Sequence, residues 1–257
     1  MSSVLCFSGG LDSVIAWFYL SYQLNYKVEA SLYCKFGHRY EEEELAALTA
    51  LNEQFSLHSL DPKIVVSSVY SSYGGIREEA NANIPARNLL LAVEAANRGG
   101  NLIHIVCQKD ERSLEDRSER FFKDASTMLA GLYNEQYLRV DPVFPDWDKT
   151  QMVEWFLMTP KFSLSYHQRL GFIRKTVACY QPVSSVPCGN CGACFRRAVA
   201  LANSKIFEEH AEPVFESATA KRYIEKNRDY SPERQKRTKM ALYLAGSSLY
   251  SSVGESV

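Results

Sequence analysis

The feature that most constrains the fold is the start of the chain, where a short apolar run passes through two glycines into a helix. Residues 4–7 predict a buried strand, and Gly9 and Gly10 predict the turn that follows it. In such a turn, successive backbone N–H groups point into one concavity, to which the next helix adds the positive end of its dipole. The segment predicts a phosphate site, although a glycine pair alone also fits an ordinary corner capped by Ser or Asp.

Polar side chains surround this turn. The complete string Ser-Gly-Gly-Leu-Asp-Ser at residues 8–13 resembles the pyrophosphate loop of the ATP pyrophosphatases, which split ATP between its α and β phosphates. Members of that family use the resulting adenylate to activate a substrate. The resemblance implies an ATP-binding loop made of Ser8, Gly9, Gly10, Leu11, Asp12 and Ser13. It also implies catalytic roles for Asp12 and Ser13.

The rest of the chain alternates strands with helices. Further strands are expected at residues 28–34, 63–69, 101–107 and 137–143, and helices at 11–22, 40–54, 88–98 and 117–133. This alternation predicts an α/β fold with a doubly wound, parallel, five-stranded sheet. We expect an ATP-binding domain at residues 1–175, a cysteine-rich segment at 176–203 and a helical extension at 204–257.

The composition of the chain bears on its predicted location and partners. The chain has 257 residues, of which 46% are hydrophobic and 23% charged, as in a soluble globular protein. We find no apolar run near the ~20 residues that cross a bilayer and no charged leader, which predicts a cytoplasmic protein without a membrane partner. The net charge of −1 provides no overall attraction to nucleic acid.

Ligands of parallel α/β sheets bind at the carboxyl ends of the strands. This rule selects residues 36–39 after the second strand, with Phe36 and Gly37 expected at the nucleotide, and Gln108 and Asp110 after the fourth. Asp110 and Asp116 are candidates for binding magnesium or a base, but the basic residues around them also fit a solvated salt-bridge face.

Two further segments carry candidate residues. Arg87 can pair with a phosphate or carboxylate and Asn88 can cap the next helix, although a surface arginine beside a cap is the alternative. Asp148 is expected to cap a helix, and Lys149 can contact a phosphate. We therefore predict catalytic and substrate roles for Arg87, a substrate role for Asn88 and a catalytic role for Lys149.

Four of the seven cysteines lie close together near the end of the predicted sheet domain. They are Cys179, Cys188, Cys191 and Cys194. Two overlapping Cys-x-x-Cys units let tight turns direct paired sulfurs at one ion, and zinc prefers four thiolates at about 2.3 Å. A closed set of four ligands predicts a structural zinc site, and an iron–sulfur cluster is the chemical alternative.

Taken in order, these blocks resemble the 7-cyano-7-deazaguanine synthase family. The match includes residues 8–13, 36–37, 85–88, 110, 116, 121, 149, 176–180 and 188–197. The resemblance implies a cytoplasmic ligase of queuosine-type biosynthesis, with ATP, Mg²⁺ and Zn²⁺ as cofactors. It implies that the enzyme adenylates 7-carboxy-7-deazaguanine and converts it with ammonia to the nitrile. A homodimer is expected on the same ground.

The chain also departs from that family. In the block at residues 108–121 the two Asp positions and Phe121 are kept, but the usual Gly, Pro and Tyr residues are absent. His38 stands where Gln is usual, and Ala178 where Ser is usual. These changes leave two alternatives open: an enzyme that joins a carboxylate to a protein or nucleic acid, and an inactive nucleotide-binding subunit.

The last 54 residues extend beyond the usual family length. Helices are expected at 221–227 and 232–244, and residues 247–257 are expected to be frayed. The second helix carries Arg234, Lys236, Arg237 and Lys239. This basic patch fits either a macromolecular partner or a solvated helix face.

Overall fold

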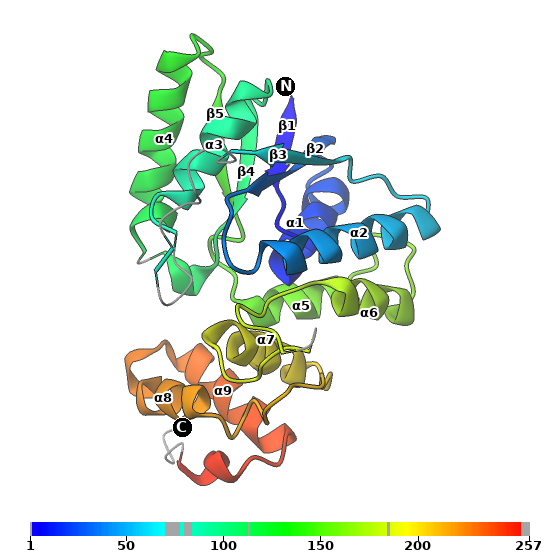
Figure 1. The fold of residues 1–257 in the computed structure, drawn as a ribbon, viewed down its shortest axis with the longest axis vertical. Coiled ribbons are helices and arrows are strands. Elements are labelled where there is room, and N and C mark those ends of the chain that lie inside the picture. Colours follow the sequence, from blue (N-terminus) through cyan, green and yellow to red (C-terminus); the bar gives the residue numbers. More distant parts are fainter. Residues whose placement is uncertain (1, 70–77, 80–83, 113, 184–185, 253–257) are drawn as a thin grey trace. The chain divides into compact units, whose positions relative to one another are not determined.

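The computed structural model describes residues 2–69, 78–79, 84–112, 114–183 and 186–252 (Figure 1). The chain divides into two compact units. The first is Met1–Trp147 with Phe156–Val177, and the second is Asp148–Trp155 with Ala178–Val257. The division of the chain at residues 175 and 203 stays a prediction.

The first unit contains the predicted parallel sheet of five strands. They are β1 (Ser3–Cys6), β2 (Val28–Lys35), β3 (Ile64–Ser68), β4 (Leu102–Val106) and β5 (Arg139–Val143). Their order in the sheet is β3-β2-β1-β4-β5, and every neighbouring pair is parallel. From β1 the chain adds β2 and then β3 toward one edge of the sheet. It then returns to place β4 and β5 on the other side of β1, so the strand order reverses between β1 and β4. Ligands of such sheets bind at this reversal.

Helices cover both faces of the sheet (Figure 1). The helices of the first unit are α1 (Leu11–Phe18) with its π-helical continuation η1 (Tyr19–Gln23), α2 (Glu41–Leu57), α3 (Arg87–Asn97), α4 (Glu119–Leu132) and α6 (Tyr166–Lys175). Helix α5 (Lys149–Met158) begins in the second unit and ends in the first. Short 3₁₀ turns η2 (Lys109–Glu111) and η3 (Glu115–Arg117) precede α4. The predicted helix at residues 11–22 is thus α-helical only as far as Phe18.

Two apolar clusters hold these layers together. On one face, Leu91 of α3 and Leu129 of α4 pack with strand residues such as Ile103. In the other cluster, the ring of Phe18 lies 5.8 Å from Phe55, and its neighbours also include Phe156, Phe162 and Phe172. Strands that are covered on both faces are apolar throughout, which explains the continuous runs in the sequence.

The second unit is mainly helical. It contains α7 (Gly192–Asn203), α8 (Ala218–Glu225), η4 (Asn227–Asp229), α9 (Pro232–Leu244) and η5 (Ser248–Ser252). The prediction for α9 is confirmed, because Ser231 caps the helix and Pro232 starts it. Helix α8 begins earlier than predicted because the Ser217 side chain accepts a hydrogen bond from the Ala220 N–H.

The prediction of a frayed C-terminal end is wrong for residues 247–252. The Ser247 hydroxyl donates to the Phe215 carbonyl at 3.0 Å, and the Ser248 N–H donates to Glu216 Oε1 at 2.7 Å. These bonds anchor η5 to the unit. Residues 253–257, which the same prediction covers, lie outside the described residues. Among the helices that the structure describes, none has the length and apolar character to cross a bilayer.

Candidate functional site

The glycine turn lies between β1 and α1. Gly9 has a φ of +72°, a conformation that strongly favours glycine, whereas Gly10 has an ordinary φ of −77° and stands at the start of α1. The Gly10 N–H donates to Ser8 Oγ at 3.3 Å, and the Ser13 hydroxyl donates to the Gly10 carbonyl at 2.9 Å. The turn therefore depends on Gly9 for its conformation and on two serines for its local hydrogen bonds.

A neighbouring segment fixes the turn from outside. The Val177 N–H donates to the Gly9 carbonyl at 3.2 Å, and Gly10 and Val177 form a parallel bridge. A Cβ on Gly10 would lie 3.2 Å from Ser8 Oγ and 3.4 Å from the Val177 carbonyl. A side chain at position 10 would thus require Ser8 to shift by a few tenths of an ångström, while the backbone angles of Gly10 suit any residue.

Asp12 lies in the first turn of α1, at the point where the strand order reverses. Its carboxylate Oδ2 accepts a hydrogen bond of 2.6 Å from the side-chain amide of Gln108, which follows β4. Gln108 is buried, while Asp12 is half-buried. The structure therefore joins the loop to Gln108, which the strand-end rule selects for the ligand site without predicting its contact with Asp12.

The turn after β2 carries a second set of polar contacts. Gly37 has a φ of +71°, and its N–H donates to Glu41 Oε2 at 2.7 Å. His38 Nε2 lies 3.0 Å from Glu44 Oε2, with both side chains largely buried. Phe36 is also buried. The acidic start of α2 thus fixes this turn, and nucleotide binding by Phe36 and Gly37 stays a prediction.

Arg87 and Asn88 stand at the start of α3. The prediction that Asn88 caps this helix is wrong, because α3 begins at Arg87 after Ala86, which has a φ of +58°. Asn88 instead donates its side-chain amide to the Asp116 carbonyl at 2.9 Å, which joins two residues predicted to bind substrate.

Burial and the nearby charge of Arg87 act on two strand thiols. Burial raises the pKa of Cys34 to about 12, while Arg87 has a smaller lowering effect. The same two causes act in the same directions on the pKa of the Cys6 thiol. Since Cys6 is the last residue of β1 and Cys34 the last but one of β2, the Arg87 charge acts on the carboxyl edge of the sheet.

The block at residues 108–121 forms a network of ion pairs. Arg117 pairs with Glu111 at 2.5 Å, and Arg112 pairs with Glu119 at 3.1 Å. A cavity of about 250 Å³ adjoins this block, with Cys107, Arg112, Arg117, Phe122 and Asp141 among its lining residues. Asp110 is exposed and Asp116 is half-buried, and the lining includes neither. Their substrate-binding roles stay predictions.

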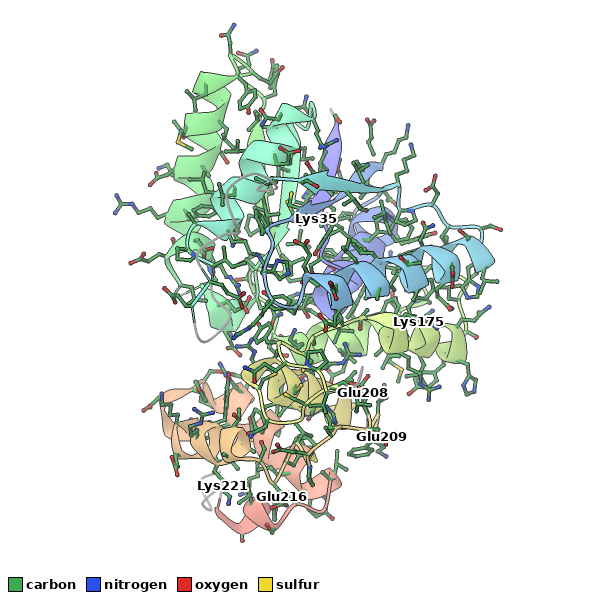
Figure 2. All side chains as sticks on the ribbon, in the orientation of Figure 1. Lys35, Lys175, Glu208, Glu209, Glu216 and Lys221 are labelled. Atoms are coloured by element: carbon green, nitrogen blue, oxygen red, sulfur yellow. The ribbon has the colours of Figure 1, made fainter. Side chains whose placement is uncertain are left out.

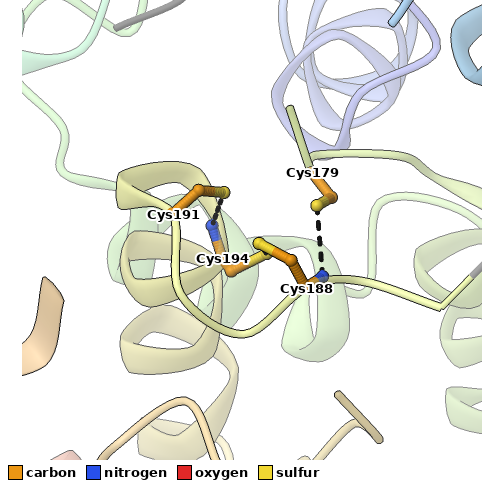
Figure 3. A group of neighbouring side chains, drawn as sticks. All are labelled: Cys179, Cys188, Cys191 and Cys194. Carbon is orange, nitrogen blue, oxygen red and sulfur yellow. Dashed lines mark hydrogen bonds between the residues drawn. The ribbon is translucent and has the colours of Figure 1, made fainter. Parts of the chain in front are cut away.

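The four clustered cysteines converge in the second unit (Figure 3). Their sulfur atoms all lie within 4.8 Å of one another, and the Sγ atoms of Cys188 and Cys194 are 3.9 Å apart. Backbone N–H groups point at the sulfurs: Cys188 N–H donates to Cys179 Sγ at 3.2 Å and Cys194 N–H to Cys191 Sγ at 3.4 Å. Four converging sulfurs with amide donors are a donor set that can hold one metal ion.

Hydrogen bonds among the thiols favour a thiolate at Cys191 and raise the pKa of Cys179 and Cys194. The thiols of Cys179 and Cys194 hydrogen-bond to Cys191 and lower the pKa of its thiol. Thiolates are the form in which cysteines bind metals. The predicted ligand set, Cys179, Cys188, Cys191 and Cys194, is thus brought together in a geometry suited to a metal.

The C-terminal extension packs on the cysteine segment. A Cβ on Gly189, whose φ is +77°, would lie 2.0 Å from the Glu212 carbonyl oxygen. Thr219 donates its hydroxyl to the Asn190 carbonyl at 2.8 Å, and the Phe195 ring lies 4.9 Å from Tyr223. Cys179, Cys188 and Cys194 belong to the same apolar cluster as residues of α8 and α9. The cysteine segment and the extension therefore share one core.

A buried ion pair also joins the cysteine segment to the C-terminal extension. The Arg197 side chain, 6% exposed, contacts the Glu208 carboxylate through Nε and Nη2, each at 2.7 Å. Glu208 and its neighbour Glu209 are labelled in Figure 2. Because both guanidinium contacts are made to the same carboxylate, the pair fixes the direction of the chain that follows α7.

The basic patch of α9 is partly used within the second unit. Arg237 Nε contacts Asp148 Oδ2 at 2.9 Å, and the Arg234 guanidinium lies 3.7 Å from the centre of the Tyr230 ring. Asp148 also caps α5 as predicted, accepting from the Gln151 N–H at 2.9 Å. Lys149 lies in this unit. Its role at a phosphate and the macromolecular partner of the patch stay predictions.

Comparison with known proteins identifies the family. A sequence model described as "Queuosine biosynthesis protein QueC" matches residues 2–205. The chain belongs to the QueC family. Two proteins named 7-cyano-7-deazaguanine synthase, from two strains of Staphylococcus epidermidis, are each 26% identical over 226 residues. These alignments cover 81% of this chain and 94% of each relative. The QueC match includes both the glycine loop and the four cysteines, and residues 206–257 lie beyond it.

Proposed function

We propose that this QueC-family chain converts 7-carboxy-7-deazaguanine to 7-cyano-7-deazaguanine, using ATP and ammonia. The observation that carries the proposal is the family match over residues 2–205, which is consistent with the 7-cyano-7-deazaguanine synthase name of both relatives. The glycine turn at the reversal of strand order supports it. Transfer to a macromolecule and an inactive subunit are not favoured, since the relatives carry the name of a nitrile-forming enzyme.

The first step is adenylation of the substrate. The carboxylate attacks the α-phosphate of ATP, the bond between the α and β phosphates breaks, and pyrophosphate leaves. Backbone N–H groups at the start of α1 and the hydroxyl of Ser8 favour the charge of the leaving group. Asp12, in the first turn of the same helix, would lie beside the phosphates.

The nitrile forms in two further stages. Ammonia attacks the acyl adenylate, AMP leaves and a proton is released, which produces the amide. The amide oxygen then attacks the α-phosphate of a second ATP, and pyrophosphate and one proton leave. Loss of AMP and of the second proton from nitrogen produces the nitrile. Arg87, at the carboxyl edge of the sheet, is suited to hold the substrate carboxylate or a phosphate through its planar guanidinium.

Two metal ions belong to the proposal. Mg²⁺ would accompany ATP and neutralise phosphate charge near Asp12. Zn²⁺ would be held by Cys179, Cys188, Cys191 and Cys194, whose sulfurs converge within 4.8 Å. Bound there, zinc would supply a structural cross-link, because four protein ligands complete its coordination.

Turnover with defined substrates tests the function. Purified protein is incubated with ATP, magnesium, ammonium and 7-carboxy-7-deazaguanine, and products are identified by mass spectrometry. We expect two AMP and one nitrile for each substrate consumed. AMP formation that depends on a different acid, with none from this substrate, would contradict the proposal.

A further inference from the structure

Gln108 and Asp12 lie 96 positions apart in the sequence, and the structure brings them into direct contact. The Gln108 amide nitrogen lies 2.6 Å from Asp12 Oδ2. Gln108 lies two residues after the end of β4, and Asp12 lies in the helix that follows β1. The hydrogen bond between them therefore spans the point where the strand order reverses. This is where a ligand of the sheet is expected to bind.

The chemistry of the two groups gives the bond one direction. An ionised carboxylate only accepts hydrogen bonds, so the amide nitrogen of Gln108 must be the donor. A hydrogen bond to a charged group is stronger than one between neutral groups, and burial of Gln108 reduces competition from water. The contact therefore restricts rotation of the Asp12 carboxylate.

The backbone on both sides of Gln108 is itself fixed. The Cys107 N–H donates to the Val143 carbonyl, and the Lys109 N–H donates to the Trp147 carbonyl, each at 3.0 Å. The Glu111 N–H donates to the carbonyl of Gln108 at 2.9 Å. With three anchors around it, Gln108 approaches Asp12 from a rigid strand end rather than from a free loop.

We propose that Gln108 is a positioning residue, whose amide holds the Asp12 carboxylate in the orientation that serves magnesium-bound ATP. The inference rests on the proposed function, because it assigns Asp12 to the nucleotide. If the carboxylate is already oriented, nucleotide binding does not incur the free-energy cost of ordering it. Gln108 would act through Asp12, because it contacts Asp12 and not the reacting atoms.

Three substitutions at position 108 test this role. Gln108→Leu keeps the approximate volume but removes the donor, so we expect AMP formation to fall about ten- to hundredfold. The magnesium concentration for half-maximal binding of a non-hydrolysable ATP analogue should rise about tenfold. Gln108→Asn keeps the amide on a shorter side chain and should restore part of both losses.

Gln108→Glu separates positioning from mere support of the fold. Two carboxylates in contact raise the pKa of one of them, so the acid limb of the AMP-formation profile should move by about one pH unit to higher pH. A purely structural role would lower the melting temperature without moving this limb. Gln54→Leu, at a glutamine of α2 whose amide contacts His58, is the matched control and should retain normal activity and magnesium dependence.

The inference is overturned if Gln108→Leu keeps magnesium dependence and AMP formation within twofold of the original protein. An unshifted pH profile in folded Gln108→Glu would also overturn it. If Gln108→Leu does not fold, Gln108→Asn and Gln108→Glu carry the test. Analogue binding keeps this test separate from the proposed function: a protein that binds magnesium–ATP but makes no nitrile refutes the function alone.

Discussion

The glycine loop and the cysteine cluster differ in the source of their order. The loop stands on a five-stranded sheet, and Val177 and Gln108 fix it from two sides. The cluster takes its four sulfurs from sixteen residues, and N–H···S bonds are its main local contacts. Thiolates within 4.8 Å of one another repel, so their assembly favours a bound cation. We therefore expect the loop in the first unit to keep its conformation without a ligand, and the cluster in the second unit to depend on a bound metal.

Metal removal should produce the largest difference between the units. Structural zinc contributes about 10–16 kcal/mol to the folding of small zinc domains. With a strong chelator, we expect hydrogen exchange in α7 and α8 to become fast while β1 and β4 stay protected. Metal analysis of fresh protein should find one zinc per chain. Unchanged hydrogen-exchange protection of α7 after metal removal would contradict the expected difference between the two units. Iron with sulfide in the metal analysis would identify an iron–sulfur cluster instead of zinc.

Asp12→Ala should show the opposite pattern, with lost activity and an intact fold. Asp12 is half-buried in the first turn of α1, so the sheet does not depend on it for packing. We expect AMP formation to fall about a hundred- to thousandfold, as for loss of one preorganised polar group in an active site. The melting temperature should stay within a few degrees. Asp124→Ala, at an exposed carboxylate on α4, is the control and should keep full activity.

Acid should weaken the first unit independently of any metal. Burial lowers the pKa of His104 in β4 to about 4 from its usual 6.5. The unfolded chain takes up a proton below pH 6.5, but the folded chain does so only near pH 4. The contribution of His104 to the free energy of unfolding is therefore fully present above pH 6.5. It falls by about 1.4 kcal/mol per pH unit between pH 6.5 and pH 4. The total loss is about 3 kcal/mol.

Urea unfolding at several pH values, followed by exchange protection of β4, measures this slope. His104→Gln removes the titrating group and should flatten the slope, although it also replaces the contact with Ser3. His167→Gln, at an exposed histidine of α6, should leave the slope unchanged. An equal slope in both variants would show that other groups control the acid response.

The smallest effect is expected from the ion pair between Arg197 and Glu208. Glu208→Gln leaves a buried guanidinium without its carboxylate and should lower the stability of the metal-loaded second unit by about 2 kcal/mol. Glu209→Gln changes an exposed neighbour of the same type and should alter stability by less than about 0.5 kcal/mol. Equal melting curves for the two variants would mean that this ion pair adds no net stability to the second unit.

Much of the fold follows from the sequence because its signals are local. Apolar strands alternating with helices specify the parallel sheet, and the string at residues 8–13 specifies the loop. The spacing of Cys188, Cys191 and Cys194 specifies a shared ligand site, because two-residue spacers permit only tight turns. Helix ends were less predictable, since α8 starts where Ser217 happens to cap it.

The long-range contacts were decided by the tertiary structure. No pattern along the chain joins Gln108 to Asp12, because the bond depends on β4 lying beside β1. The use of Asn88 to bind the Asp116 carbonyl also depends on how two distant segments meet. The extension looked like a separate tail, but its apolar side chains complete the core around the cysteines. Local sequence determines the elements and their ligand-bearing turns, while packing determines which polar groups meet, because that depends on strand order and register.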